Sequence, residues 1–300
     1  MADLITIIVN IYNNESTLRN CIISLIAQTY RDIEIILIDD GSTDSSSRIC
    51  DDLVLTNSKM RVIHKLHSGI SSSRNNGLDI ATGKYVTFVN ASDTIKPNML
   101  EELYRATQNY PIDISICSTS SSNNSINDAK FMILEKEDAL RQILLEKNFK
   151  NTILGKLFKK DLFNTIRFSE DNSEIVTKLF EISTKVAYTN SNYYICSNEE
   201  TFTRTSLINR DIRIMQLYPN LKLYCQYNIL INIQSEFYNC FCNNIPVINS
   251  DNMYKMFLQI IDDNEERIIP FLSNVQKAHM YLLANDYTNY KRICPVLPEL

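Results

Sequence analysis

The chain has 300 residues, of which 44% are hydrophobic and 22% charged, with a formal net charge of −5 and a pI near 5.4. This composition is typical of a globular protein and excludes a disordered one, and the acidic balance leaves no basic surface of the kind that binds nucleic acid. Because no apolar run approaches the roughly 18 residues of a membrane span and the start lacks the pattern of a signal peptide, we expect a cytoplasmic protein, with at most peripheral contact at the cytoplasmic face of a membrane.

The first half of the sequence alternates apolar strands with amphipathic helices. Residues 4–9 are typical of a buried strand, and residues 18–26 repeat apolar side chains at helical spacing. A second apolar run follows at residues 33–39. Because such a βαβ connection is right-handed and parallel, the loops after both strands should lie side by side, so that Tyr12 and Asp40 could face one ligand. The alternative for Tyr12 is a half-buried aromatic side chain at a strand end.

The second apolar run stops at Asp39 and Asp40, which Gly41 follows. Open α/β sheets bind ligands at the carboxyl edge of their parallel strands, and a carboxylate side chain has no place in the hydrogen-bond ladder. We therefore expect a ligand that carries hydrogen-bond donors, such as a ribose or a base imide. The alternative is that Asp40, Ser42 or Asp44 caps the next helix.

Two more units of strand and helix complete this half. They are predicted as a helix at residues 44–53, a strand at 60–64, a helix that begins near 69, and a strand at 85–89. The helix start at Gly69 offers free backbone N–H groups to an anion, and Arg74 adds a bidentate cation, so Arg74 is a candidate diphosphate or uridine contact. His64 and His67 have no partner at metal-ligand spacing and are interpreted as surface or loop residues. Gly83 is expected to end the helix in a left-handed conformation. The pattern predicts an α/β, doubly wound sheet.

Several motifs of this half resemble a known family. They are residues 8–13 (IVNIYN), 28–30 (QTY), 38–44 (IDDGSTD), 68–75 (SGISSSRN) and 81–85 (ATGKY), with Pro97 and Glu101. The motifs are collinear over about the first 105 residues, and together they resemble family-2 glycosyltransferases, which have the type-A fold. A weaker match follows at residues 155–163, after which this family forms its acceptor side.

The resemblance implies transfer of a sugar, with inversion, from a nucleotide-sugar donor that is usually uridine-linked. It implies that Tyr12 lies beside the base, that Asp40 bonds the base or ribose, and that Arg74 lies near the same group. Asn10 and Arg204 are further candidates for donor binding. The implied acceptor is a glycan, a glycolipid or a protein.

The chain departs from this family where a divalent cation, Mn²⁺ or Mg²⁺, is held on the diphosphate. The family ends its fourth strand with Asp-x-Asp-Asp, and this chain has Asn90, Ser92 and Asp93 at the three acid positions. Asn90 and Ser92 stay candidates for donor binding, and Asp93 is the one carboxylate left for a metal. The alternative is that cations such as Lys96 or Arg204 neutralise the leaving diphosphate.

A second departure concerns the catalytic base, which the family places in a Glu-Asp pair at the mouth of a helix. The nearest acids here are Glu170 and Asp171, in a loop that is several residues short. Asp171 is the preferred candidate, with Glu170 as the alternative. Asp171 could instead be the N-cap of the helix that begins near Ile175.

The remainder of the sequence predicts one more strand, at residues 112–117, and a helical pattern after Arg204. We therefore expect a glycosyltransferase-like domain over residues 1–205 and a helical region over residues 206–300. The helical region could pack on a second copy of the chain or on an active homologue.

Three functions remain in competition. The first is an active glycosyltransferase, which we favour because the motifs of the base-binding side are complete. The second is a catalytically impaired relative that serves as a binding or scaffolding partner, since both catalytic elements depart from the family. The third is a response-regulator-like receiver, which rests only on Asp39 and Asp40 and gives residues 69–76 and 83–85 no role.

Overall fold

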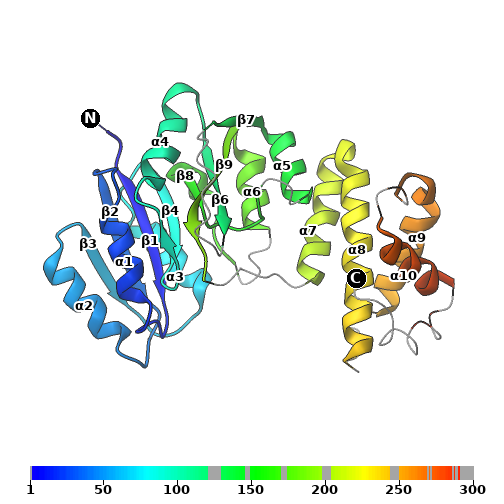
Figure 1. The fold of residues 1–300 in the computed structure, drawn as a ribbon, viewed down its shortest axis with the longest axis horizontal. Coiled ribbons are helices and arrows are strands. Elements are labelled where there is room, and N and C mark those ends of the chain that lie inside the picture. The colour runs from blue at the N-terminus through cyan, green and yellow to red at the C-terminus, as the bar shows by residue number, and fades with distance from the viewer. Residues whose placement is uncertain are drawn as a thin grey trace. The chain divides into compact units, whose positions relative to one another are not determined.

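The computed structural model describes residues 2–120, 130–145, 149–169, 174–197, 204–243, 250–268, 270, 272–285, 287 and 290 (Figure 1). The chain divides into two compact units, Met1–Thr201 and Phe202–Leu300. The boundary expected after residue 205 falls in the first turn of helix α7, Arg204–Leu217.

The first unit is built on one mixed sheet. Its described residues form nine strands, ordered β3-β2-β1-β4-β8-β6-β9-β5 with β7 paired to β9. The parallel half consists of β1 (Ile5–Ile11), β2 (Ile33–Asp39), β3 (Met60–His64) and β4 (Tyr85–Asn90). These strands are the four apolar runs of the sequence, and they are mostly apolar because helices cover both faces of the sheet. The predicted α/β arrangement is confirmed.

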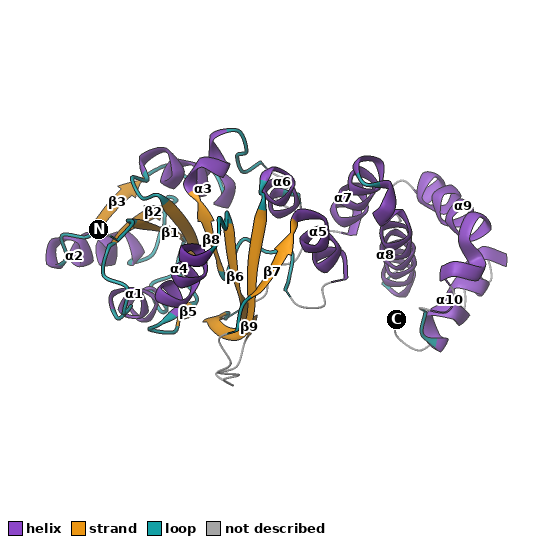
Figure 2. Cartoon of the chain, turned by 90° about the horizontal axis from the view of Figure 1, so that it is seen from above, coloured by secondary structure: helices purple, strands orange, loops and turns teal. Residues whose placement is uncertain are grey.

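Helices pack on this half of the sheet in the manner of a doubly wound fold. They are α1 (Leu18–Ile26), α2 (Ser46–Thr56), α3 (Ile70–Ile80) and α4 (Met99–Asn109). Figure 2 shows α3 on one face of the sheet and α1 and α4 on the other. The strand order reverses direction between β1 and β4, so the carboxyl ends of these two strands form the switch point at which open α/β sheets bind ligands.

The other half of the sheet was only partly predicted. Its elements are β5 (Thr94–Ile95), β6 (Ile114–Ser120), β7 (Met132–Glu135), β8 (Lys156–Lys159) and β9 (Lys185–Ile195), with helices α5 (Lys136–Leu145) and α6 (Ile175–Ile182). Strand β6 was expected. Strand β8 runs antiparallel between β4 and β6, and β9 joins β6, β7 and β5.

Gly83 does not have the left-handed conformation that the sequence suggested. Helix α3 ends with Ala81 as its C-cap, and the φ angle of Gly83 is not positive. Glycine is required there by space instead, because a Cβ atom would lie 2.6 Å from Thr6 Oγ1 and 2.7 Å from Thr6 N.

A carboxylate organises the amino edge of the sheet. Glu34 Oε1 accepts hydrogen bonds from Thr6 Oγ1 at 2.5 Å and from Thr82 N at 2.6 Å. Its other oxygen, Oε2, lies 2.5 Å from Arg61 Nη2. Burial raises the pKa of Glu34, but the hydrogen bonds from Thr6 and Thr82 and the charge of Arg61 outweigh it and hold that pKa below its ordinary value.

We expect Glu34→Gln to lower the free energy of unfolding by about 1–2 kcal/mol near neutral pH, because charge-assisted hydrogen bonds become neutral ones. Since the folded-state pKa is depressed, this stabilisation is present above the unfolded-state pKa and is lost as the pH falls through the folded-state pKa. Urea unfolding at pH 7 and near pH 3 should show the difference shrinking. Glu135→Gln, which changes an exposed pair with Lys185, is the control and should have little effect at either pH. If the difference in free energy of unfolding between the wild type and Glu34→Gln is as large near pH 3 as at pH 7, the depressed pKa of Glu34 is contradicted.

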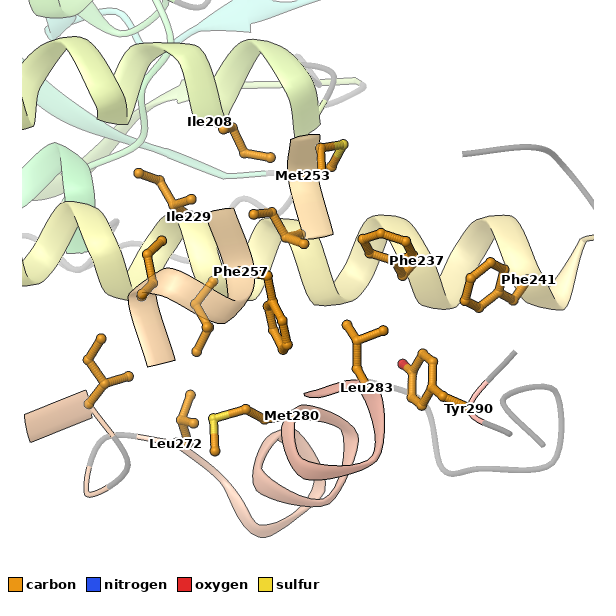
Figure 3. Packing of buried hydrophobic residues seen from close by; sticks show 14 residues of the cluster. Ile208, Ile229, Phe237, Phe241, Met253, Phe257, Leu272, Met280, Leu283 and Tyr290 are labelled. Atoms are coloured by element: carbon orange, nitrogen blue, oxygen red, sulfur yellow. The ribbon is translucent and has the colours of Figure 1, made fainter. Parts of the chain in front are cut away.

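The second unit is a group of helices with its own core. They are α7, α8 (Lys222–Cys242), α9 (Ser250–Ile268) and α10 (Asn274–Asn285). Figure 3 shows Phe237 of α8, Phe257 of α9, and Met280 and Leu283 of α10 gathered in one cluster, and all four are buried. The predicted helical character of this region is confirmed. Over the residues that the structure describes, no helix combines the length and apolar character that crossing a membrane requires.

Candidate functional site

Two asparagines lie side by side at the switch point of the sheet. Asn10, near the end of β1, is in register with Asn90, the last residue of β4, and with Ile38 of β2. Asn10 Oδ1 is buried and accepts no hydrogen bond from any described residue. Buried carbonyl oxygens without a donor are rare, so a ligand that brought an N–H or O–H group here would gain a bond.

The loops after β1 and β2 are joined by hydrogen bonds. Asn13 Oδ1 accepts the backbone N–H of Thr43 at 2.8 Å, and Asn13 itself has a φ of 53°, which asparagine tolerates. One step further, Asp44 Oδ2 accepts the N–H of Glu15 at 3.0 Å. Glu15 Oε2 in turn accepts the N–H of Ser45 at 3.0 Å. The two loops therefore lie together, as their parallel topology predicted.

Asp40 directly follows β2 and is buried. Both of its carboxylate oxygens accept hydrogen bonds. Oδ1 accepts from Lys65 Nζ at 2.5 Å and from the N–H of Ser68 at 3.0 Å. Oδ2 accepts from the N–H of Gly69 at 2.8 Å and lies 3.0 Å from Nδ1 of His67. Burial raises the pKa of Asp40, but the hydrogen bonds from Lys65 and the backbone hold it below its ordinary value, so Asp40 is charged at neutral pH. A carboxylate has about four acceptor sites, and three of them are filled by these hydrogen bonds, while Nδ1 of His67 bonds the backbone oxygen of Asp40 at 3.1 Å.

Tyr12 and His67 form a stacked pair above this carboxylate. Their ring centroids are 4.2 Å apart with an interplanar angle of 28°. Tyr12 is 45% exposed, and the His67 side chain is 55% exposed. The backbone beneath is fixed, because Gly41 has a φ of 73° and packs so closely that a Cβ atom there would lie 2.8 Å from His67 N.

Asp39 points away from this cluster and serves the fold. Its Oδ1 accepts the N–H of Ser42 at 3.1 Å, and its Oδ2 lies 2.8 Å from His64 Nδ1. The other ring nitrogen of His64 lies 3.0 Å from Asp51 Oδ1. The hydrogen bond to Asp39 raises the pKa of His64, with a smaller opposing effect of burial. His64 is thus a half-exposed residue with two carboxylate partners.

Arg74 extends to the carboxyl end of β4. It is 2% exposed, its Nη2 donates to Asn90 Oδ1 at 3.3 Å, and its guanidinium lies 5.3 Å from the ring centroid of Phe168. Asn75, the next residue of α3, exchanges two hydrogen bonds with the backbone of Phe168, at 2.9 and 3.0 Å. Arg74 therefore contacts Asn90, which stands at the first of the three acid positions.

Asp93 is buried in a hydrogen-bond network of its own. Tyr194 Oη donates to Asp93 Oδ2 at 2.8 Å, and the N–H and hydroxyl of Ser197 donate to Oδ1 at 2.8 and 3.0 Å. Ser92 Oγ lies 3.2 Å from the same oxygen. Asp93 is 1% exposed. Its carboxylate thus ties the turn after β4 to the end of β9.

The side chains present do not fit a resident divalent cation. Mn²⁺ and Mg²⁺ prefer carboxylate oxygens, whereas Asn90 offers an amide and Ser92 a hydroxyl, and both oxygens of Asp93 already accept hydrogen bonds. Among the described residues, no group of three or more His, Cys, Asp or Glu side chains is arranged to hold a metal.

The two candidates for the catalytic base, Glu170 and Asp171, lie outside the described residues, as does the side chain of Arg204. The segment that leads to them is attached to α3, because Ser71 Oγ donates to the carbonyl oxygen of Ser169 at 2.6 Å.

Sequence analysis did not name Lys65, and it interpreted His67 as a surface or loop residue with no place in the site. Both residues follow β3. Because His64 of β3 is in register with Asp39 of β2, the residues after His64 lie next to Asp40. The parallel order of these strands was predicted, and it could have indicated a cation at position 65.

The model of the family described as glycosyl transferase family 2 matches residues 6–167. Glycosyltransferase GlyG of Streptococcus pneumoniae is 32% identical over 213 residues, which are 65% of this chain and 71% of GlyG. Staphylococcus aureus TarS 1–349, solved in complex with UDP-GlcNAc, has a TM-score of 0.66 at 15% identity, covering 98% of this chain and 88% of that one. The mannosyltransferase PcManGT of Pyrobaculum calidifontis, in complex with GDP-Man and Mn²⁺, has a TM-score of 0.56 at 14% identity, covering 99% and 85%.

The two structural matches show the fold and agree with the expected type-A architecture followed by helices. The family model covers more than half of the chain, and GlyG is covered over more than two thirds of its length. The chain therefore belongs to glycosyl transferase family 2.

Proposed function

We propose that this protein transfers a sugar from a UDP-sugar, with inversion, to a glycan, glycolipid or protein acceptor. The observation that carries the proposal is the placement of Asn10, Tyr12 and Asp40 at the carboxyl ends of the neighbouring parallel strands β1 and β2, where the N–H of Asp40 donates to the carbonyl oxygen of Ile11 at 2.9 Å. A uracil base presents an imide N–H between two carbonyl oxygens, which suits a charged carboxylate beside an aromatic ring. The complexes of TarS with UDP and with UDP-GlcNAc support uridine as the nucleoside.

In the proposed complex the base lies against Tyr12, with its imide donating to Asp40. Asn10 Oδ1 accepts from the ribose, which satisfies an oxygen that is buried without a donor among the described residues. Arg74 holds Asn90 at the end of β4, on the diphosphate side of the site. We place the general base at Asp171, with Glu170 as the alternative. The support is that Ser169, which directly precedes this pair, is hydrogen-bonded to Ser71 of α3.

A second candidate function rests on the same site. No carboxylate stands at positions 90 and 92, and Asp93 is occupied by Tyr194 and Ser197. A relative that keeps the base pocket without the charge that neutralises a leaving diphosphate could bind nucleotides as a partner of an active homologue, using its helical region for contact. We favour the transferase because the base side is complete.

The proposal predicts that Asp40→Ala weakens the binding of UDP by about 1–3 kcal/mol, because the imide of the base loses its acceptor. Isothermal titration calorimetry with UDP measures this, and thermal unfolding shows that the variant is folded. Asp52→Ala, at a half-exposed carboxylate 3.8 Å from Arg19, is the control and should bind as the wild type does. Equal affinity of Asp40→Ala and the wild type would remove Asp40 from the site, and absence of UDP binding by the wild type would contradict the proposed function.

A further inference from the structure

In the structure the imidazole of His67 makes two contacts that a nucleobase would make in the proposed complex. It stacks on Tyr12, with centroids 4.2 Å apart. Its Nδ1 lies 3.0 Å from Asp40 Oδ2 and 3.1 Å from the backbone oxygen of the same residue. Both neighbours are acceptors, so Nδ1 carries a hydrogen and donates. An aromatic ring that stacks on Tyr12 and directs an N–H at Asp40 has the recognition features of a uracil imide.

We infer that His67 occupies the place of the nucleobase and leaves it when the donor binds. The inference rests on the proposed function, in which Tyr12 and Asp40 hold the base, and it assigns to His67 the control of donor affinity. A ring that must be displaced competes with the ligand, so its removal should strengthen nucleotide binding. Removal of a residue that only contacts the ligand would weaken nucleotide binding instead.

The geometry allows the ring to leave without a movement of the loop. The backbone at His67 is packed against Gly41 and is anchored by the bonds of Ser68 and Gly69 to Asp40. The side chain is 55% exposed, so rotation about its own torsions carries it into solvent. Its departure clears the space 3.0 Å from Asp40 Oδ2 and frees the backbone oxygen of Asp40, while Lys65 remains bonded to Oδ1.

The competing arrangement is a sandwich, in which the base stacks on the outer face of Tyr12 and His67 stays in place. In that arrangement His67 supports the platform, and its loss weakens binding. The two arrangements therefore predict opposite signs for one substitution.

The test is calorimetric titration of the full chain with UDP, comparing the wild type with His67→Ala. We expect His67→Ala to bind UDP about three- to tenfold more tightly, a factor set by the loss of one aromatic pair that competes with the base. Two intermediate variants should bind UDP with affinities between those of the wild type and His67→Ala. They are His67→Phe, which keeps a ring without the N–H, and His67→Gln, which keeps a donor without the ring. Leu66→Ala is the matched control, since its side chain is 90% exposed in the same loop, and it should leave the affinity unchanged.

Unchanged or weaker binding by a folded His67→Ala, when the wild type binds UDP, overturns the inference and leaves the proposed function standing. If no variant binds UDP, the proposed function and the inference fall together. If His67→Ala does not fold, the Phe and Gln variants decide. Tighter UDP binding than the wild type supports the inference, and unchanged or weaker binding overturns it.

A second measurement observes the ring directly. The chain has three histidines, His64, His67 and His279, so a carbon-correlated spectrum of histidine-labelled protein holds few imidazole signals. On addition of UDP we expect the His67 signal to lose the shielding of the Tyr12 ring and to shift downfield, whereas His279, buried in the second unit, stays unchanged. A His67 signal that keeps its position at saturating UDP, or moves further upfield, would contradict displacement.

Discussion

Introducing the two missing acids, Asn90→Asp together with Ser92→Asp, should make UDP binding and donor hydrolysis depend on Mn²⁺. The wild type offers an amide and a hydroxyl at these positions, whereas the double variant directs two carboxylates at the diphosphate side of the site. A preorganised charge that neutralises a leaving group is typically worth about 10²–10³ in rate, so Mn²⁺ should raise donor hydrolysis by roughly that factor in the variant. The measurements are UDP calorimetry and release of UDP from UDP-GlcNAc, each in Mn²⁺ and in excess chelator.

The control for this prediction is Asn90→Ala with Ser92→Ala, which changes the same positions without adding charge and should not respond to Mn²⁺. A double Asp variant that binds UDP with Mn²⁺ but hydrolyses no donor would favour the binding-partner function, since the base would then be missing as well. A wild type that turns over UDP-sugar at full rate in chelator would show that the absent acids do not limit the enzyme. The charge would then have to come from a cation of the chain, such as Lys96, Arg167 or Arg204.

Asp93→Ala should lower the free energy of unfolding by about 3–5 kcal/mol in the absence of any metal. The substitution leaves the fully buried hydroxyl of Tyr194 and the N–H of Ser197 without their acceptor. Burial raises the pKa of Tyr194 well above its ordinary value, with a further contribution from the charge of Asp93, so the phenol is a neutral donor at neutral pH. Urea unfolding of the wild type and the variant in chelator measures the loss.

Two further variants separate the structural role of Asp93 from metal binding. Asp93→Asn keeps one acceptor and should lose less stability than Asp93→Ala. Adding Tyr194→Phe to Asp93→Ala should cost little more, because the two groups belong to one network and their effects do not add. If Asp93→Ala unfolds as the wild type does, but loses a Mn²⁺ response that the wild type possesses, Asp93 is a metal ligand and the structural role is wrong.

The sequence predicted the parallel half of the sheet because both of its faces are covered, which makes the strands mostly apolar. Strand β9 was missed for the opposite reason. Four consecutive polar residues, from Thr189 to Asn192, interrupt it between Tyr188 and Tyr193, and the burial of this strand depends on partners in β6 and β7 that are distant in the chain. No local pattern marks such a strand.

The same distinction holds in the site. Tyr12 and Asp40 could be placed together from the order of the strands alone, and the structure brings their loops together. The surroundings of Asp93 could not be predicted, because Tyr194 and Ser197 follow it by 101 and 104 residues. The contact of His67 with Tyr12 likewise depends on a side-chain orientation that a motif does not encode.

The hydrogen bonds between the loops after β1 and β2 bear on the entropy of donor binding. Ordering a free loop or a side chain during association costs about 0.5–1.5 kcal/mol for each immobilised group. Here Asn13, Glu15 and Asp44 have already ordered both loops within the folded chain. The ligand would therefore meet a preorganised cradle. Little of the chain would lose conformational freedom at the base end, and a displaced His67 imidazole would gain it.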